Sequence, residues 1–202
     1  GLPPEAVLAA RRLIRGEPDD LIERIDLEAD FFRERLQSLE WMGDRTRQKA
    51  LEKLDAFQLK IGYPDKWKRY DGLEIQRGSY ILNVLRAGEY EMKRQLAKVD
   101  KPVDRTEWFM TPSTVNAYYN PTMNEIVFPA GILQPPFFDP NADDAVNYGG
   151  MGAVIGHEIT HGFDDEGRKF DAKGNLTDWW TKEDNERFEQ LAAIVEEQFS
   201  GY

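Results

Sequence analysis

The chain has 202 residues, and its 26 lysines and arginines against 37 aspartates and glutamates give a formal net charge of −11. An acidic chain repels phosphate backbones and anionic lipid headgroups, so the charge argues against a nucleic-acid or membrane-surface role. No cysteine is present, which excludes disulfide bonds and thiol catalysis. Because the sequence begins with Gly1 rather than methionine, we expect it to be an internal piece of a longer chain.

The first half of the chain contains four amphipathic segments with apolar residues at helical spacing. They predict helices over 4–15, 19–39, 44–61 and 77–99. Gly62 and Pro64 would end the third helix. The apolar faces of these helices are typical of core packing rather than of a cofactor site.

The pattern changes after Pro102. Two β-prone runs, 115–119 and 125–128, flank a group of turn residues and predict a β-hairpin. Helices are expected over 143–161 and 181–199, the latter opened by a capping box that begins at Thr181. The predicted fold class is therefore mainly α with a small β-sheet (α+β).

The only two histidines of the sequence, His157 and His161, lie four residues apart, and Glu158 follows the first. On a helix this spacing places both imidazoles on one face, where they converge on a single tetrahedral zinc ion. Glu158 would lie beside the ion, within reach of a metal-bound water. Its carboxylate could accept a proton as that water attacks a carbonyl, and return it to the leaving amine. The alternative is a helix whose histidines satisfy polar groups of the core.

A catalytic zinc site takes three protein ligands, so a carboxylate must complete the set in a chain with no third histidine. A metzincin would need glycine at 164 and histidine at 167, which the sequence does not have. Asp164 and Asp165 are candidates for orienting the imidazoles through hydrogen bonds. The alternative for these acids is a solvated acidic face.

Six segments carry a pattern of wider extent: IGYPD at 61–65, VNAYY at 115–119, IVFPAGILQPPFF at 126–138, NYGG at 147–150, VIGHEITHGFDD at 154–165 and DWW at 178–180. Together they resemble the zinc metallopeptidase family of neprilysin, endothelin-converting enzyme and bacterial oligopeptidase O. The resemblance implies a thermolysin-like zincin catalytic half with helices of a second, lid-like α domain. Residues 1–80 would be the C-terminal helices of the lid domain, 81–99 a connecting helix, and 100–202 the N-terminal part of the catalytic domain.

The resemblance also implies roles for single residues. His157 and His161 would bind one zinc ion, and Glu158 would be the general base. Asn116 and Ala117 would lie on an edge strand and hydrogen-bond the backbone of a peptide substrate, as the exposed edge of the predicted hairpin allows.

A pocket for the residue after the scissile bond would be lined by Ile132, Phe137 and Val154. The family's third ligand is a glutamate in a Glu-x-x-x-Asp motif, and no such motif follows His161 here. The expected partner is therefore a second polypeptide fragment that carries the rest of the catalytic domain.

The expected function is a zinc-dependent endopeptidase that hydrolyses small peptides on the amino side of hydrophobic residues, once the missing C-terminal segment completes it. The alternative is a non-catalytic, truncated peptide-binding module with an incomplete metal site. The absence of cysteine favours a bacterial protein. A periplasmic or secreted location is expected, with the cytoplasm as the other possibility, and no membrane segment is expected in this chain.

Overall fold

The computed structural model describes residues 18–202, with side chains from Ile25 onward. The helix expected over 4–15 lies outside the described residues. The chain divides into two compact units, one made of its first part up to Tyr63 together with Met110–Tyr202, the other of Pro64–Phe109. Among the described helices, none is both long and apolar enough to span a lipid bilayer.

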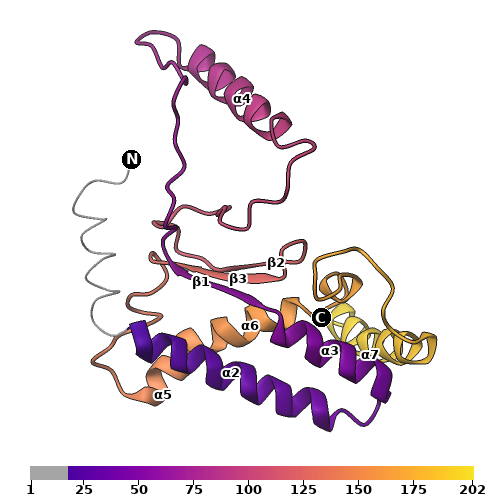
Figure 1. The fold of residues 1–202 in the computed structure, drawn as a ribbon. Helices are drawn as coiled ribbons and strands as arrows, with labels where there is room; N and C mark the ends of the chain where they lie inside the picture. Colours follow the sequence, from indigo (N-terminus) through magenta and orange to yellow (C-terminus); the bar gives the residue numbers. More distant parts are fainter. Residues whose placement is uncertain (1–17) are drawn as a thin grey trace. The chain divides into compact units, whose positions relative to one another are not determined.

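The first unit contains a three-stranded sheet with the order β1-β3-β2 (Figure 1). The central strand β3 (Glu125–Pro129) is buried along its whole length. It runs parallel to β1 (Gln58–Gly62) and antiparallel to β2 (Tyr118–Asn120), which forms one edge. The predicted hairpin is therefore present as β2 and β3, and the predicted α+β class is confirmed.

The helix predicted over 44–61 is wrong in its second half. Helix α3 (Asp44–Asp55) ends early, and β1 follows it. From Phe57 to Ile61 apolar and polar residues alternate, which is the period of a strand. Pairing with β3 satisfies the backbone of this segment, with Ile61 opposite Phe128.

Helix α2 (Pro18–Ser38) packs against both α3 and α6 (Ala153–His161), and α6 also contacts β2 (Figure 1). Two apolar residues of α2, Ile25 and Leu36, lie in the core, each 4% exposed. From α6, Ile155 and Ile159 pack into the same core with Phe128 of β3. Helix α6 is thus held between a helix and the edge of the sheet.

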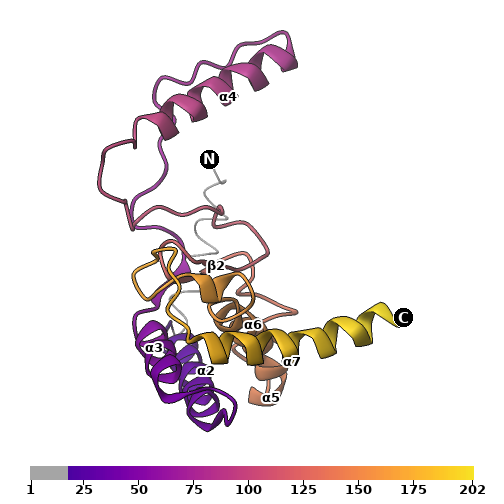
Figure 2. The same ribbon diagram turned by 90° about the vertical axis from the view of Figure 1, so that its right-hand side faces the viewer.

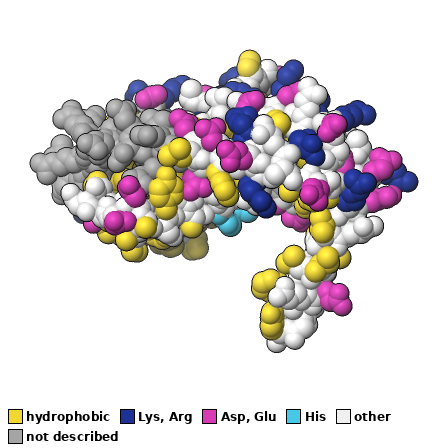
Figure 3. Space-filling model, turned by 90° about the horizontal axis from the view of Figure 1, so that it is seen from below, with side chains coloured by type: hydrophobic (Ala, Val, Ile, Leu, Met, Phe, Trp, Pro, Cys, Tyr) yellow, Lys and Arg dark blue, Asp and Glu magenta, His cyan; other side chains and the backbone are white. Residues whose placement is uncertain are grey.

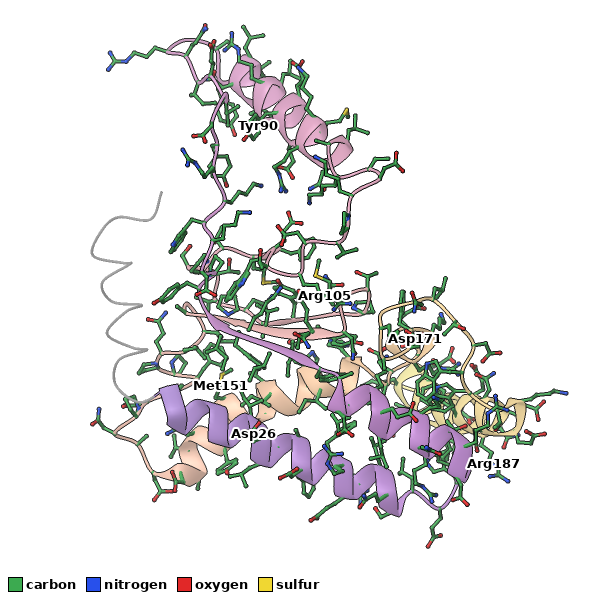
Figure 4. The ribbon with its side chains drawn as sticks, in the orientation of Figure 1. Asp26, Tyr90, Arg105, Met151, Asp171 and Arg187 are labelled. Atoms are coloured by element: carbon green, nitrogen blue, oxygen red, sulfur yellow. The ribbon has the colours of Figure 1, made fainter. Side chains whose placement is uncertain are left out.

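The helical stretch predicted over 143–161 is present but not uniform. It consists of α5 (Asp144–Asn147), one π-helical turn η1 (Tyr148–Gly152) and α6. Met151 of η1, labelled in Figure 4, is 1% exposed and belongs to the core. At Gly150 a Cβ would stand 2.5 Å from the carbonyl oxygen of Phe137, so only glycine allows this close approach.

The last helix, α7 (Lys182–Ser200), begins at the predicted cap, where Thr181 Oγ1 accepts a hydrogen bond from the N–H of Asp184. A short 3₁₀ turn η2 (Gly167–Lys169) lies between α6 and α7. Figure 2 shows the C-terminal half of α7 extending away from the rest of its unit, and its residues from Leu191 onward are exposed. Arg187, labelled in Figure 4, donates to the carbonyl of Trp41 over 2.8 Å.

The second unit contains α4 (Tyr80–Leu96), close to the helix predicted over 77–99. Tyr90, labelled in Figure 4, donates to the carbonyl of Arg69 over 3.1 Å. Arg94 forms an ion pair with Glu107 over 2.7 Å, which ties the helix to the segment after it. The assignment of 1–80, 81–99 and 100–202 to a lid domain, a connecting helix and a catalytic domain stays a prediction.

Candidate metal centre

The two histidines converge on one face of α6. Nε2 of His157 and Nε2 of His161 are 3.0 Å apart, and the two rings stand nearly perpendicular, at 83°. Two nitrogen ligands of a tetrahedral zinc ion lie about 3.3 Å apart when each bond is about 2.05 Å. The two nitrogens therefore fit two positions of such an ion after a small outward rotation of the rings. Histidine atoms, coloured cyan in Figure 3, reach the surface on this face.

Asp164 orients the second of these rings. Its Oδ2 lies 2.7 Å from Nδ1 of His161, while its Oδ1 accepts the N–H of Gly167 over 2.7 Å. A carboxylate at Nδ1 holds the imidazole proton there and leaves the lone pair of Nε2 directed towards His157. This is the tautomer that a metal ligand needs. Asp165, the other predicted orienting acid, is exposed.

Glu158 is 4% exposed and lines the same cleft as the histidines. Burial raises the pKa of its carboxyl, against the opposing effects of His161, His157 and a hydrogen bond from the backbone N–H of Tyr119. Within the part of the chain that the structure describes, its Oε2 has no hydrogen-bond partner. A buried carboxylate oxygen without a partner is costly in a closed core and is suited to a site that receives a polar ligand.

The cleft has a volume of about 360 Å³ and is also lined by Asn116 and Ala117. Both residues lie just before β2, because the edge strand expected over 115–119 begins only at Tyr118. Oδ1 of Asn116 accepts the N–H of Ala117 over 2.9 Å. Their role in binding a peptide backbone stays a prediction, now with both residues beside the histidines.

The three residues predicted to form a side-chain pocket lie elsewhere. Ile132 is 3% exposed and belongs to the core, while Phe137 and Val154 are half-buried and pack against that core. None of the three lines the described cleft. Their assignment to the pocket after the scissile bond stays a prediction.

A third ligand is not found among the side chains of residues 25–202, where no three His, Asp or Glu side chains are grouped to hold a metal ion. Two further acids line the cleft. Asp164 contacts Nδ1 of His161, and Glu166 is paired with Lys169 over 2.7 Å. The donor set that the structure places together is therefore two imidazoles with a carboxylate beside them.

Tyr119 is a contact that the sequence analysis missed, since its backbone N–H reaches the carboxyl of Glu158. The predicted hairpin already contained the feature that indicates this contact. Alternate N–H groups of an edge strand point away from the sheet, and β2 is such a strand.

Comparison with known proteins gives matches over most of the chain. Two models of peptidase family M13 match residues 21–64 and 116–202. An endothelin-converting enzyme homolog of Locusta migratoria is 48% identical over 85% of this chain and 24% of its own length. Neprilysin-3 of Drosophila melanogaster is 44% identical over 95% of this chain and 25% of its own length. The chain thus spans about a quarter of the curated relatives that it matches.

Solved structures agree with these matches. The zinc metalloprotease Zmp1 of Mycobacterium tuberculosis, in complex with an inhibitor, is 51% identical with a TM-score of 0.87, over 96% of this chain and 30% of that one. PepO of Lactobacillus rhamnosis is 38% identical with a TM-score of 0.77, over 85% of this chain and 28% of that one. Since the relatives include both insect and bacterial proteins, the expected bacterial source stays a prediction.

Proposed function

Because the chain belongs to peptidase family M13, we propose that it forms part of a zinc-dependent endopeptidase that hydrolyses small peptides on the amino side of hydrophobic residues. The observation that carries the proposal is the 3.0 Å approach of the Nε2 atoms of His157 and His161, with Glu158 beside them in one cleft. This arrangement combines two neutral nitrogen ligands with a carboxylate that can accept a proton.

His157 and His161 would hold the metal ion, and their geometry fits that role. Asp164 supports it, because a carboxylate oxygen 2.7 Å from Nδ1 of His161 favours the tautomer with the proton on Nδ1. When bound, zinc supplies a Lewis acid that polarises a carbonyl and makes water more acidic.

Glu158 would carry the protons. Its buried Oε2 has no partner among the described residues, so a lone pair is available for the attacking water. A hydrogen bond from the backbone N–H of Tyr119 favours the ionised form of the same carboxyl and so opposes the rise of its pKa. Glu158 accepts the proton of the water as the peptide carbonyl is attacked, and delivers it to the amide nitrogen as the C–N bond breaks. Asn116, lining the same cleft, would hydrogen-bond the substrate backbone.

The third protein ligand would come from outside these 202 residues, either on a further segment of the same polypeptide or on a second one. Two observations support this. The sequence has no third histidine, and in the described part of the chain no carboxylate joins the two histidines as a third ligand. A periplasmic or secreted location remains our proposal for the compartment.

A second candidate function is a peptide-binding module without catalysis. The observation that favours it is the same two-ligand donor set, which would bind zinc weakly if no third ligand is supplied. The two functions differ in zinc content and in turnover.

The deciding experiment uses the full protein that carries this chain and compares it with its Glu158→Gln variant. We expect both to retain zinc after dialysis, because Glu158 is not a ligand. Hydrolysis of a fluorogenic peptide with a hydrophobic residue after the scissile bond should fall by roughly 10²–10⁴-fold in the variant. Glu197→Gln, at an exposed position of α7, is the matched control and should keep full activity. Peptide binding without zinc in the unmodified protein would favour the module instead.

A further inference from the structure

Lys53 of α3 is a lysine with no exposed surface. Its Nζ donates to three backbone carbonyls, those of Gly162 over 2.6 Å and of Gly167 and Phe170 over 2.7 Å each. An ammonium group has three protons, so every one of them has an acceptor. Lysine is almost never fully buried unless it is paired in this way.

The three acceptors belong to one short segment, the loop that follows the histidine helix. Gly162 is the residue directly after His161, and Phe170 follows the 3₁₀ turn η2. Asp164 lies inside this loop, and its Oδ1 accepts the N–H of Gly167 while its backbone carbonyl accepts the N–H of Arg168. The ammonium therefore holds the loop on both sides of the carboxylate that contacts the metal centre.

The loop lies tightly against α6 at Gly167, where a Cβ would overlap the carbonyl oxygen of His161. Aromatic rings surround the ammonium, with Nζ 5.6 Å from the centroid of Phe163 and 5.7 Å from that of Tyr119. Asp171, labelled in Figure 4, is one of two acids whose charge favours the ammonium form.

Burial disfavours this charge and outweighs the opposing effects of Asp164 and Asp171, so the pKa of Lys53 falls to about 8. A methionine would fill a similar volume without that cost, and core packing alone does not explain a lysine. What lysine adds is a set of three directed hydrogen bonds to the loop that contains Asp164.

We propose that Lys53 is a positioning residue of the metal centre. By holding the carbonyls of Gly162, Gly167 and Phe170, it fixes Asp164 against Nδ1 of His161. It thereby sets the proton position and the orientation of the second histidine ligand. The inference rests on the proposed function in one respect, that His161 is a metal ligand.

The test is a double-mutant cycle in the full protein, with Lys53→Met, Asp164→Asn and both together. Zinc affinity is measured by competition with a chelator. We expect Lys53→Met to weaken zinc binding about tenfold when Asp164 is present, and by less than about twofold when Asp164 is already changed. A purely structural role would lower the free energy of unfolding but leave the zinc affinity and the coupling unchanged.

Two further variants complete the design. Lys53→Gln keeps hydrogen-bond donors without the charge, and it decides the outcome if Lys53→Met does not fold. Lys49→Met, one turn earlier on α3 and half-exposed, is the matched control and should change neither measurement. If neither Lys53 variant folds, the lysine serves the fold as a whole and the specific role is overturned.

A measurement without metal separates this inference from the proposed function. NMR of the ring nitrogens in the apoprotein reports which nitrogen of His161 carries the proton. We expect Nδ1–H in the unmodified protein and a mixture of tautomers in Lys53→Met. Unchanged ring signals in Lys53→Met overturn the role of Lys53. Absence of zinc binding in the unmodified protein overturns the metal site instead, and the ring signals then still test whether Lys53 sets the proton position of His161.

Discussion

The hydroxyl of Thr46 donates to the carboxylate of Asp184 over 2.6 Å, joining the first turn of α3 to the first turn of α7. The other oxygen of that carboxylate accepts the N–H of Gly43 over 2.8 Å. One buried side chain thus stands at the N-termini of two helices, where the helix dipoles favour a negative charge. The contact fixes the start of α7 to the start of α3, within the unit that also carries the histidines.

We expect Asp184→Asn to lower the free energy of unfolding by about 1.5–3 kcal/mol at pH 7, the range for hydrogen bonds to a charged group. Burial acts to raise the pKa of Asp184, but the hydrogen bonds from Thr46, Gly43 and Thr181 outweigh it and hold the pKa below its usual range. The contribution of this carboxylate is therefore complete above about pH 4 and is lost as the pH falls through the lowered pKa.

Urea unfolding at a series of pH values measures this effect. The difference between Asp184→Asn and the unmodified protein should be largest near neutral pH and should shrink below about pH 4. Asp44→Asn is the control, since that fully exposed acid forms a surface ion pair with Arg47 and should change stability by less than about 0.5 kcal/mol. If the difference in the free energy of unfolding between the two proteins did not depend on pH, the stabilising role of the ionised Asp184 would be contradicted.

Asp164→Asn should weaken zinc binding by about 10–100-fold, because the imidazole of His161 loses the carboxylate that fixes its tautomer. Its neighbour Asp165 is exposed, so Asp165→Asn should leave the affinity unchanged. Titration of the metal-free protein with zinc checks both. Equal losses in the two variants would indicate a general effect of negative charge rather than a specific contact.

Asn116→Ala should lower kcat/KM for a peptide substrate by an amount equivalent to about 1–3 kcal/mol, as expected for a lost hydrogen bond to the substrate backbone. Zinc content should not change, because Asn116 lines the cleft with its Oδ1 bonded to the N–H of Ala117 rather than to a histidine. Asn141→Ala, an exposed asparagine of the loop before α5, serves as the control. Unchanged kinetics in Asn116→Ala would show that the backbone of the substrate is bound elsewhere.

Gly167→Ala should destabilise the protein by about 3 kcal/mol or more, because the added methyl group overlaps the carbonyl oxygen of His161 and the loop cannot move without breaking its contacts. Gly156→Ala is the opposite case within α6. Nothing lies within 4 Å of a Cβ added there, so helix propensity alone should stabilise the protein by about 0.5–1 kcal/mol. Thermal unfolding checks both expectations, since the midpoint temperature should fall in Gly167→Ala and rise in Gly156→Ala.

The sequence alone predicts that the two histidines lie close together, because residues four apart on a helix share one face, as His157 and His161 do. The cap at Thr181 is equally local, since its partner Asp184 is three residues away. Both features depend on short-range rules that need no knowledge of the tertiary structure.

The strand β1 and the role of Lys53 could not be predicted in the same way. Residues 58–62 form a strand only because β3 is available to pair with them, and β3 lies more than sixty residues later. Lys53 is spaced three and four residues from Ala50 and Phe57, on the face that was assigned to the core. A charged residue on an apolar face indicates a buried polar contact. The sequence does not identify the partners of Lys53, because they are backbone carbonyls of a distant loop.

The π-helical turn η1 also sets the direction of the histidine face. Asn147, just before this turn, is fixed by two hydrogen bonds with the backbone of Asp139, so the start of the helical stretch cannot rotate. The wide turn absorbs one extra residue before α6 begins. In a regular α-helix of the same sequence, His157 and His161 would be turned by about 100° around the axis. A single-residue change in the length of this segment would therefore re-aim both imidazoles, which makes its spacing as important as its composition.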